Sequence, residues 1–130
     1  MVRGLIQRIT TGLLIAGLLL CLAGCGGSGG GGGNELEARE ALTKALDAWK
    51  AGRKADEMRN ENPEVIVGDP DWKDGRRLTA YQIGSGMFDG KNLRVPVTLT
   101  VEQPPRGQRK VVANYIVGTR PVVTLFRDGE

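Results

Sequence analysis

The sequence predicts an α+β fold in which an N-terminal helix packs on a four- to five-stranded antiparallel meander sheet, in two layers. Two patterns of apolar residues predict this fold. Between residues 35 and 50, apolar side chains recur every three or four positions, as on a helix with one buried face. Beyond Pro63 they recur every second position, as on strands. A helix with one apolar stripe and a sheet with one apolar face bury each other.

The first predicted element is a helix over residues 35–50. Its residues are good helix formers, and Asn34 can cap a first turn whose acidic side chains suit the positive end of the helix dipole. Gly52 interrupts the pattern, and residues 53–59 can form one more helical turn before Pro63. The stripe expected to face the sheet contains Ala38, Leu42, Ala45, Leu46 and Trp49.

Five segments after Pro63 have the composition and alternation of strands. The third shows the clearest alternation, but it contains Pro96, which has no amide hydrogen. We therefore expect this strand to lie at an edge, to bulge at Pro96, or to point that amide position away from its neighbour. The predicted strands cover residues 65–67, 78–83, 93–101, 110–117 and 122–127.

A cluster of three carboxylates lies between the first two predicted strands, within residues 69–75. The acids and Gly75 are not spaced as in an EF-hand calcium loop, whereas Asp-Pro and Asp-Gly pairs are typical of turns. We therefore expect a solvated turn at this position and no metal site. Trp72 is expected to fold back over the edge of the core.

The first 24 residues have the pattern of a secretory signal peptide. Two arginines precede an uncharged apolar run that is too short to span a membrane, and small residues follow it. The residues Leu22-Ala23-Gly24-Cys25 resemble the bacterial lipobox. This resemblance implies cleavage between Gly24 and Cys25, with Cys25 joined to diacylglycerol as the first residue of the mature protein. We therefore expect a lipid anchor at Cys25 that holds the protein to a membrane of the cell envelope.

Residues 25–33 contain this cysteine and a run of glycines with one serine, which offers no side chain able to pack. Such a tether has a root-mean-square reach of about 14–17 Å, so the single domain that follows, residues 34–130, stays close to the bilayer. Gly26, and not an aspartate, follows the lipid-bearing cysteine. In a double-membrane bacterium, the lipobox resemblance then favours the outer membrane.

Composition excludes several kinds of site. The chain contains no histidine, and its only cysteines are Cys21 and Cys25. Zinc sites built from histidine and cysteine, histidine-based acid–base catalysis and a disulfide within residues 34–130 are therefore excluded. We expect no cofactor, no metal and no catalytic set of residues.

The charges do not suggest a nucleic-acid partner, because the chain carries 18 basic and 15 acidic residues. Six of the basic residues lie in two predicted loops. Anionic headgroups or peptidoglycan could attract these loops, although exposed basic residues are by default solvated surface. The six residues are Lys73, Arg76, Arg77, Arg106, Arg109 and Lys110.

Residues 41–52 resemble the opening helix of the nuclear-transport-factor-two-like, SnoaL-like domains, which often ends in an aromatic residue followed by a glycine-containing break, here Trp49 and Gly52. The resemblance implies helices over a curved antiparallel sheet. Enzymes of that superfamily place Asp, His or Tyr in a cone-shaped pocket between helix and sheet, but this chain lacks histidine and some segments of a full-length member. One helix on such a sheet is also similar to the cystatin-like arrangement, without a protease-inhibitor motif.

The residues predicted to line a pocket under the helix are Trp49, Tyr81, Asn114 and Tyr115. The simpler alternative places the tyrosines at the edge of the core with their hydroxyls in water. An enzyme would need a closed cavity with a desolvated carboxylate, whereas a binding module would fill this space with side chains such as Leu46, Trp49 and Phe88.

We favour a lipid-anchored, non-enzymatic module that binds an envelope protein, a cell-wall polymer or a small ligand. The alternative is a SnoaL-like enzyme or a small-ligand-binding protein that uses a pocket between helix and sheet, with Tyr81 or Tyr115 as acid or hydrogen-bond donor. The unpaired edge of such a small sheet would also allow a dimer.

Overall fold

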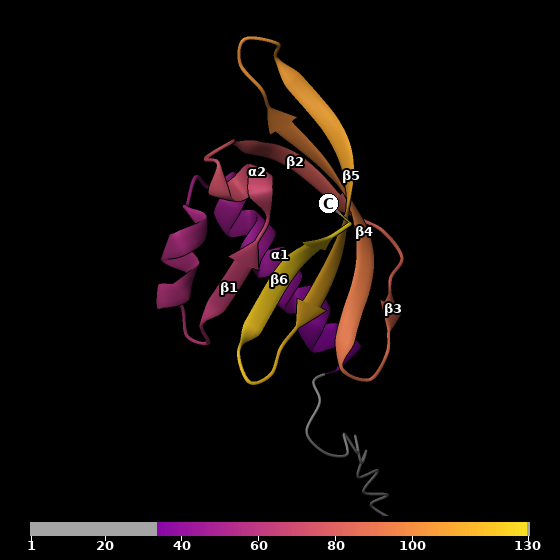
Figure 1. Cartoon of the computed structure of the whole chain (residues 1–130). Coiled ribbons are helices and arrows are strands. Elements are labelled where there is room, and N and C mark those ends of the chain that lie inside the picture. Colours follow the sequence, from indigo (N-terminus) through magenta and orange to yellow (C-terminus); the bar gives the residue numbers. More distant parts are fainter. Residues whose placement is uncertain (1–33, 130) are drawn as a thin grey trace, which may run out of the picture.

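The computed structural model describes residues 34–129, so the signal peptide, the cleavage site at Gly24, Cys25 and the glycine-rich tether lie outside the described residues. The described chain contains helix α1 (Glu35–Lys50), the 3₁₀ helix η1 (Ala55–Asn60), the short helix α2 (Pro70–Lys73) and one open sheet. Figure 1 shows the helices gathered against one face of this sheet. The predicted α+β class is therefore confirmed. Among these residues, no helix combines the length and apolar composition that a membrane span requires.

Helix α1 forms where the sequence predicts it. The side chain of Asn34 caps it by accepting a hydrogen bond from the backbone N–H of Glu37 at 2.7 Å. The helix stops after Lys50 because Gly52 adopts a φ of +93°, in the left-handed region that favours glycine. All five residues of the predicted apolar stripe are buried, namely Ala38, Leu42, Ala45, Leu46 and Trp49.

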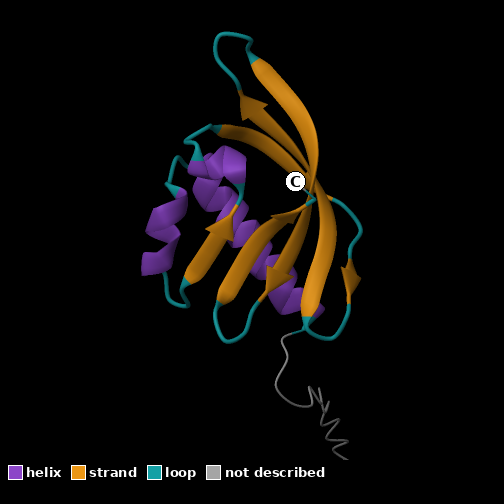
Figure 2. Cartoon of the chain, in the orientation of Figure 1, coloured by secondary structure: helices purple, strands orange, loops and turns teal. Residues whose placement is uncertain are grey.

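The six strands form a mixed sheet (Figure 2), in which the order along the sheet is β1-β6-β5-β4-β2 and β3 pairs with β4. Most neighbours are antiparallel, but β1 runs parallel to β6, with Val65 opposite Val123. The strands are β1 (Val65–Gly68), β2 (Leu78–Ile83), β3 (Met87–Phe88), β4 (Asn92–Glu102), β5 (Gln108–Gly118) and β6 (Val123–Asp128).

The parallel pair corrects the expected antiparallel meander of four to five strands. Strands β1 and β2 are consecutive in the sequence, yet they occupy opposite ends of the strand order. The connection between them folds as α2 instead of a tight hairpin, so β1 joins the free edge of β6 and β2 joins β4. A pairing between the first and last strands leaves no local turn signal from which it can be predicted.

Strand β4 supplies the centre of the core. Its alternate residues Leu93, Val95, Val97, Leu99 and Val101 are all buried on the inner face, which is the face that packs on the helices. Pro96 lies inside this strand, between β5 and β2. Its carbonyl accepts a hydrogen bond from the backbone N–H of Gly84 at 2.8 Å, so its amide position faces the β2 side and the ladder with β5 is intact. The third of the alternatives expected for Pro96 is therefore correct.

Replacement of Leu46 by alanine tests the packing of α1 on the sheet. Leu46 is 0% exposed, and Leu46→Ala should lower the free energy of unfolding by about 2–5 kcal/mol, because it leaves a cavity in the core. Leu36→Ala on the same helix is the matched control, since Leu36 is 66% exposed and its loss should change this free energy by less than about 0.5 kcal/mol. Urea unfolding followed by circular dichroism measures both. Equal losses would contradict packing through this stripe.

Candidate functional site

Residues 69–77 connect β1 to β2 and contradict the expected solvated turn. Pro70–Lys73 of this connection form α2, for which Asp69 is the N-cap and Pro70 occupies the first turn. The Asp69 side chain accepts hydrogen bonds from the backbone N–H groups of Asp71 at 2.9 Å and Trp72 at 3.2 Å. Asp69 is 0% exposed and Asp71 is 4% exposed, so the prediction of a solvated turn is wrong. The dipeptide Asp-Pro is found both in turns and at the start of helices. Here the arginines that contact Asp69 and Asp71 favour the helix over a solvated turn.

The carboxylate of Asp69 is held from the inner face of the sheet. Arg127 of β6 places its Nη2 2.9 Å from Asp69 Oδ2, and the hydroxyl of Tyr115 of β5 donates to the same oxygen. The Arg127 side chain is itself buried. Burial, and then the charge of Asp69, raise the pKa of Tyr115, so its hydroxyl stays protonated and remains a donor. One oxygen of Asp69 therefore binds α2 and the other binds the sheet.

Asp71 accepts hydrogen bonds from three guanidiniums. Nitrogen atoms of Arg76, Arg127 and Arg109 lie 2.7, 2.9 and 3.1 Å from its oxygens, respectively. Burial acts to raise the pKa of Asp71, but the hydrogen bonds and charges of Arg127, Arg76 and Arg109 outweigh it, and the pKa lies below its ordinary value. The carboxylate therefore stays ionised. We call the set of Asp69, Asp71, Arg76, Arg109, Tyr115 and Arg127 the buried charge network, and it ties α2 to β5 and β6.

Helix α2 also brings Trp72 against Trp49 of α1. Their ring centroids lie 5.2 Å apart and their planes differ by 3°, so the two indoles are stacked. Trp49 Nε1 donates to the carbonyl of Arg76 at 2.7 Å, and Trp72 Nε1 donates to the carbonyl of Arg53 at 2.8 Å. Both indoles are buried, so the predicted folding of Trp72 over the core is confirmed. The indole pair thereby holds the end of α1 beside α2.

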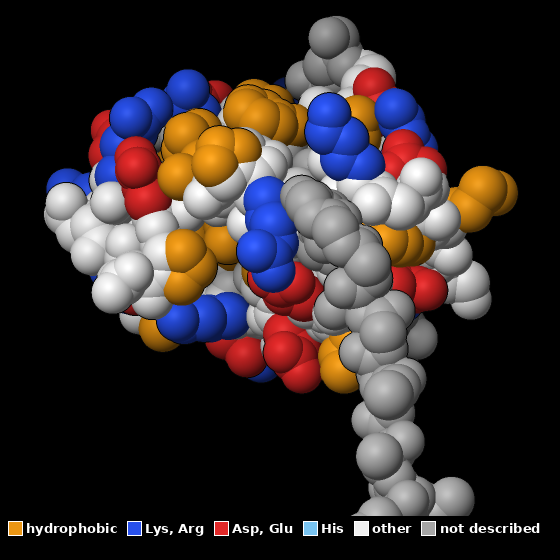
Figure 3. Space-filling model, turned by 90° about the horizontal axis from the view of Figure 1, so that it is seen from below, with side chains coloured by type: hydrophobic (Ala, Val, Ile, Leu, Met, Phe, Trp, Pro, Cys, Tyr) orange, Lys and Arg blue, Asp and Glu red, His pale blue; other side chains and the backbone are white. Residues whose placement is uncertain are grey.

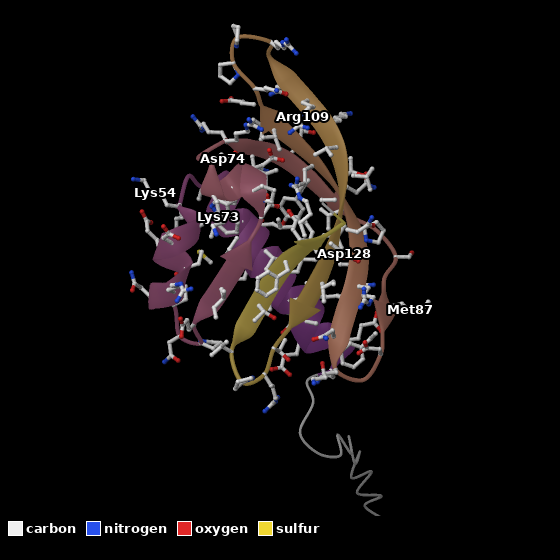
Figure 4. The ribbon with its side chains drawn as sticks, in the orientation of Figure 1. Lys54, Lys73, Asp74, Met87, Arg109 and Asp128 are labelled. Atoms are coloured by element: carbon white, nitrogen blue, oxygen red, sulfur yellow. The ribbon has the colours of Figure 1, made fainter. Side chains whose placement is uncertain are left out.

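A cleft of about 410 Å³, open to solvent, lies beside the indole pair. Its walls are the turn after α1, the start of η1 and the C-terminal end of α2. Figure 4 shows Lys54, Lys73 and Asp74 on this side of α2, whereas Arg109 comes from β5. Basic side chains outnumber acidic ones in the lining, which contains Arg53, Lys54, Lys73, Arg76 and Arg77 but only Asp56 and Asp74.

Some of the basic side chains in the cleft already form ion pairs, and the others do not. Arg53 and Arg76 form ion pairs with carboxylates outside the cleft. Within residues 34–129, Lys54, Lys73 and Arg77 form no ion pair, and all three are exposed. An anionic group that entered the cleft would therefore meet three cations that need no carboxylate displaced.

A second hollow, of about 270 Å³, opens between α1 and the neighbouring ends of β1 and β6. Glu37, Glu40 and Lys44 of α1 contribute polar groups to it. Its apolar lining consists of Ala41, Ala45, Met58, Pro63, Val65 and Val123. We call this hollow the apolar groove. Farther along α1, the space between helix and sheet is filled by core side chains such as Leu42, Leu46 and Leu99.

The end of the domain at which the described chain begins carries a mixed surface. Seen from below in Figure 3, hydrophobic, basic and acidic side chains are interspersed over this end. Over the whole of residues 34–129, and not at this end alone, the exposed large hydrophobic residues come from four different elements; they are Leu36, Met87, Val112 and Phe126. Neither charge dominates the face that this view presents.

The four residues predicted to line a pocket do not converge on one. Trp49 belongs to the indole pair and Tyr115 to the buried charge network. The hydroxyl of Tyr81 donates to Asp47 Oδ1 of α1 at 2.5 Å, and burial together with this carboxylate raises the pKa of Tyr81 to about 12. Asn114 is exposed on the opposite face of β5 from Tyr115. Of these four residues, only Trp49 lines the cleft.

The sequence did not predict that Asp69 and Asp71 form ion pairs with Arg127. Asp69 and Arg127 are 58 residues apart in the chain. One signal was present in the last predicted strand, where Arg127 is in phase with the core residues Val123 and Leu125. A charged residue in phase with a buried face needs a charged partner, although the pattern does not say which one.

The chain matches no protein-family model, no curated protein and no solved structure. In the part of the chain that the structure describes, no group of acidic or cysteine side chains is arranged to hold a metal ion. The resemblance to SnoaL-like or cystatin-like domains stays a prediction. The function of this protein therefore rests on the residues of its own chain.

The acid dependence of stability should depend on Asp71. Because the pKa of Asp71 is lowered in the folded protein, this residue contributes stability above its ordinary pKa of about 3.9, and the contribution is lost as the pH falls through the folded value. Asp71→Asn should lower the free energy of unfolding at neutral pH by about 1.5–3 kcal/mol, because three guanidiniums lose a charged acceptor while Arg127 keeps Asp69. It should also flatten the pH dependence below about pH 4. Urea unfolding at a series of pH values measures both effects.

Asp74→Asn is the matched control for this variant, because Asp74 is exposed at the C-terminal end of the same helix. It should change the free energy of unfolding by less than about 0.5 kcal/mol. An acid limb in Asp71→Asn that runs parallel to that of the unmodified protein would contradict the role given to the network.

Proposed function

We propose that this protein is a lipid-anchored cell-envelope protein whose folded part is a non-enzymatic binding module. The cleft beside α2 is the binding site, and it takes an anionic group of a ligand, a partner protein or a cell-wall polymer. The protein reaches this location through its leader, which is cut between Gly24 and Cys25. The lipid on Cys25 and the glycine-rich tether then hold the domain close to the membrane, with the outer membrane favoured by Gly26.

The observation that carries the binding role is the contrast between paired and free charges. Catalysis by an acid or a base needs a group that can exchange a proton with bound substrate. Asp69 and Asp71 are instead saturated by hydrogen bonds, and the Tyr115 hydroxyl is engaged with Asp69. The free cations Lys54 and Lys73 stand in the open cleft, where they suit reversible binding.

The apolar groove supports a second candidate function, which is binding of a small apolar ligand between α1 and the sheet. Its lining is mostly aliphatic, with Glu37 and Glu40 able to contact a polar end of the ligand. Neither Tyr81 nor Tyr115 lines the groove, so it supports binding more than a SnoaL-like reaction that uses those tyrosines.

The lipid anchor is tested by Cys25→Ser. In bacteria fed with an alkyne-bearing palmitate analogue, the unmodified protein should be labelled, and the variant should lose the label because serine cannot form the thioether. Cys21→Ser is the matched control and should remain labelled, because Cys21 lies within the leader. Continued labelling of the Cys25 variant would remove the lipobox from the proposal.

The cleft is tested with pyrophosphate as an anionic probe. Titration of the labelled full chain in detergent micelles, followed by amide chemical shifts, should show saturable shifts around Lys54 and Lys73. The double variant Lys54→Gln with Lys73→Gln should weaken binding about tenfold or more, because two charge-assisted contacts are removed. Lys91→Gln removes a single charge from an exposed turn elsewhere and should not change the affinity. Equal affinities in all three proteins would contradict the site.

A further inference from the structure

The hairpin of β4 and β5 leaves one side of β5 unpaired. Strand β6 pairs with β5 only from Asn114 to Gly118. Residues 108–113 of β5 pair with β4 on one side, and within residues 34–129 they pair with no strand on the other. In Figure 1 this part of the hairpin extends beyond the rest of the sheet, at the top of the view. We call this side of residues 108–113 the open edge.

The position of Pro96 indicates which backbone groups face the open edge. Its carbonyl bonds with Gly84 on the β2 side, so Pro96 and Asn114 are a pair without mutual hydrogen bonds. Hydrogen-bonded and non-hydrogen-bonded pairs alternate along an antiparallel ladder. Asn114 therefore points its N–H and C=O toward β6, and Val112 and Lys110 point theirs the same way, beyond the end of β6.

The residues that carry these backbone groups are exposed. Val112 is 62% exposed, and Lys110 is exposed beside it. Unpaired N–H and C=O groups at the edge of a sheet are a template for another strand. The open edge therefore has the backbone geometry of a site for strand addition.

Charge decides which strand fits. Lys110 lies on the open edge and Arg106 in the turn before β5, and both are exposed, whereas Arg109 is engaged with Asp71. Glu102 is the acidic residue of the same hairpin. If β5 of a second copy paired antiparallel with this edge, Lys110 of each chain would lie opposite or diagonal to the other, which is unfavourable. An acidic strand would instead place carboxylates beside these cations.

We propose that the open edge of β5 binds an extended acidic segment of a partner protein, which adds to the sheet as a strand next to Lys110 and Val112. The main chain of that segment pairs with the N–H and C=O groups of these two residues. An acidic side chain lies beside Lys110 and an apolar one beside Val112. Strand β6 ends beside Asn114, so the added strand is collinear with β6 and begins where β6 stops. This surface is separate from the cleft beside α2 and does not depend on it.

The test uses a synthetic strand peptide, long enough to cover residues 108–113, in which a glutamate and a valine stand two residues apart on one face, so that the first lies beside Lys110 and the second beside Val112. A peptide with lysine in place of glutamate is its charge-reversed counterpart. Binding to the full chain in detergent micelles is measured by fluorescence anisotropy, and protection of the Lys110 and Val112 amides by hydrogen exchange. The acidic peptide should bind saturably, about tenfold or more tightly than the basic one, and should protect both amides. Absence of saturable binding, or unprotected amides in the complex, would overturn the proposal.

Val112→Pro separates backbone pairing from side-chain contact. It removes an N–H that faces the open edge and leaves the hydrogen bonds between β5 and β4 in place. Peptide affinity should fall about tenfold or more, whereas Val112→Thr keeps the N–H and should bind like the unmodified protein. Circular dichroism checks that both variants are folded. Unchanged affinity in folded Val112→Pro would overturn the proposal.

If Val112→Pro does not fold, Lys110→Glu replaces it, since this change reverses the charge at an exposed position and keeps the backbone N–H. It should reverse the preference between the acidic and the basic peptide, and an unchanged preference would overturn the proposal. The cleft variant Lys54→Gln with Lys73→Gln should bind the acidic peptide normally, because loss of binding there would place the peptide in the cleft. Self-association of the full chain that depends on Val112 would assign the edge to a second copy and overturn the proposal.

Discussion

The guanidinium of Arg127 is buried at the end of β6 and needs negative charge beside it, which Asp69 and Asp71 supply from α2. This requirement positions much of the molecule. It draws α2 onto the inner face of the sheet, where Tyr115 completes the contacts of Asp69. With α2 in this position, β1 and β2 cannot form a hairpin with each other, so each joins a different edge of the sheet. The same placement brings Trp72 onto Trp49 and closes one side of the core.

Helix α2 therefore has two sides with different roles. Its buried side carries Asp69 and Asp71, whose charges are fully engaged inside the protein. Its solvent side carries Lys73, which forms no ion pair among the described residues and stands in the cleft with Lys54. Because Arg76 lines the cleft and also pairs with Asp71, an anionic ligand would compete with Asp71 for the positive charge of Arg76. Under the proposed function, binding at the cleft would be coupled to the stability of the network through this arginine.

The long hairpin of β4 and β5 has a different physical basis. Apolar residues alternate along the whole of β4, and all of them are buried, so this strand is held over its full length. Strand β5 pairs with it throughout, but β6 ends opposite Asn114 and leaves the remainder of β5 without a second neighbour. Lys110 discourages self-pairing of this unpaired backbone, in keeping with the way natural sheets protect their edges. The cleft and the open edge are thus two separate surfaces on one small domain.

The sequence by itself determined the features that depend on neighbouring residues. The period of apolar residues predicts α1 and β4, and the cap at Asn34 and the break at Gly52 predict the bounds of α1. The lipid anchor, which the leader predicts from residues of the same kind, stays a prediction. Only the tertiary structure decided the parallel pairing of β1 with β6, the pairing of Arg127 with Asp69 and Asp71, and the cleft that results. Periodicity, capping and turn chemistry act over a few residues, whereas a buried charge can be satisfied by any opposite charge that folding brings to it. A partner 58 residues away therefore leaves no local pattern to be read.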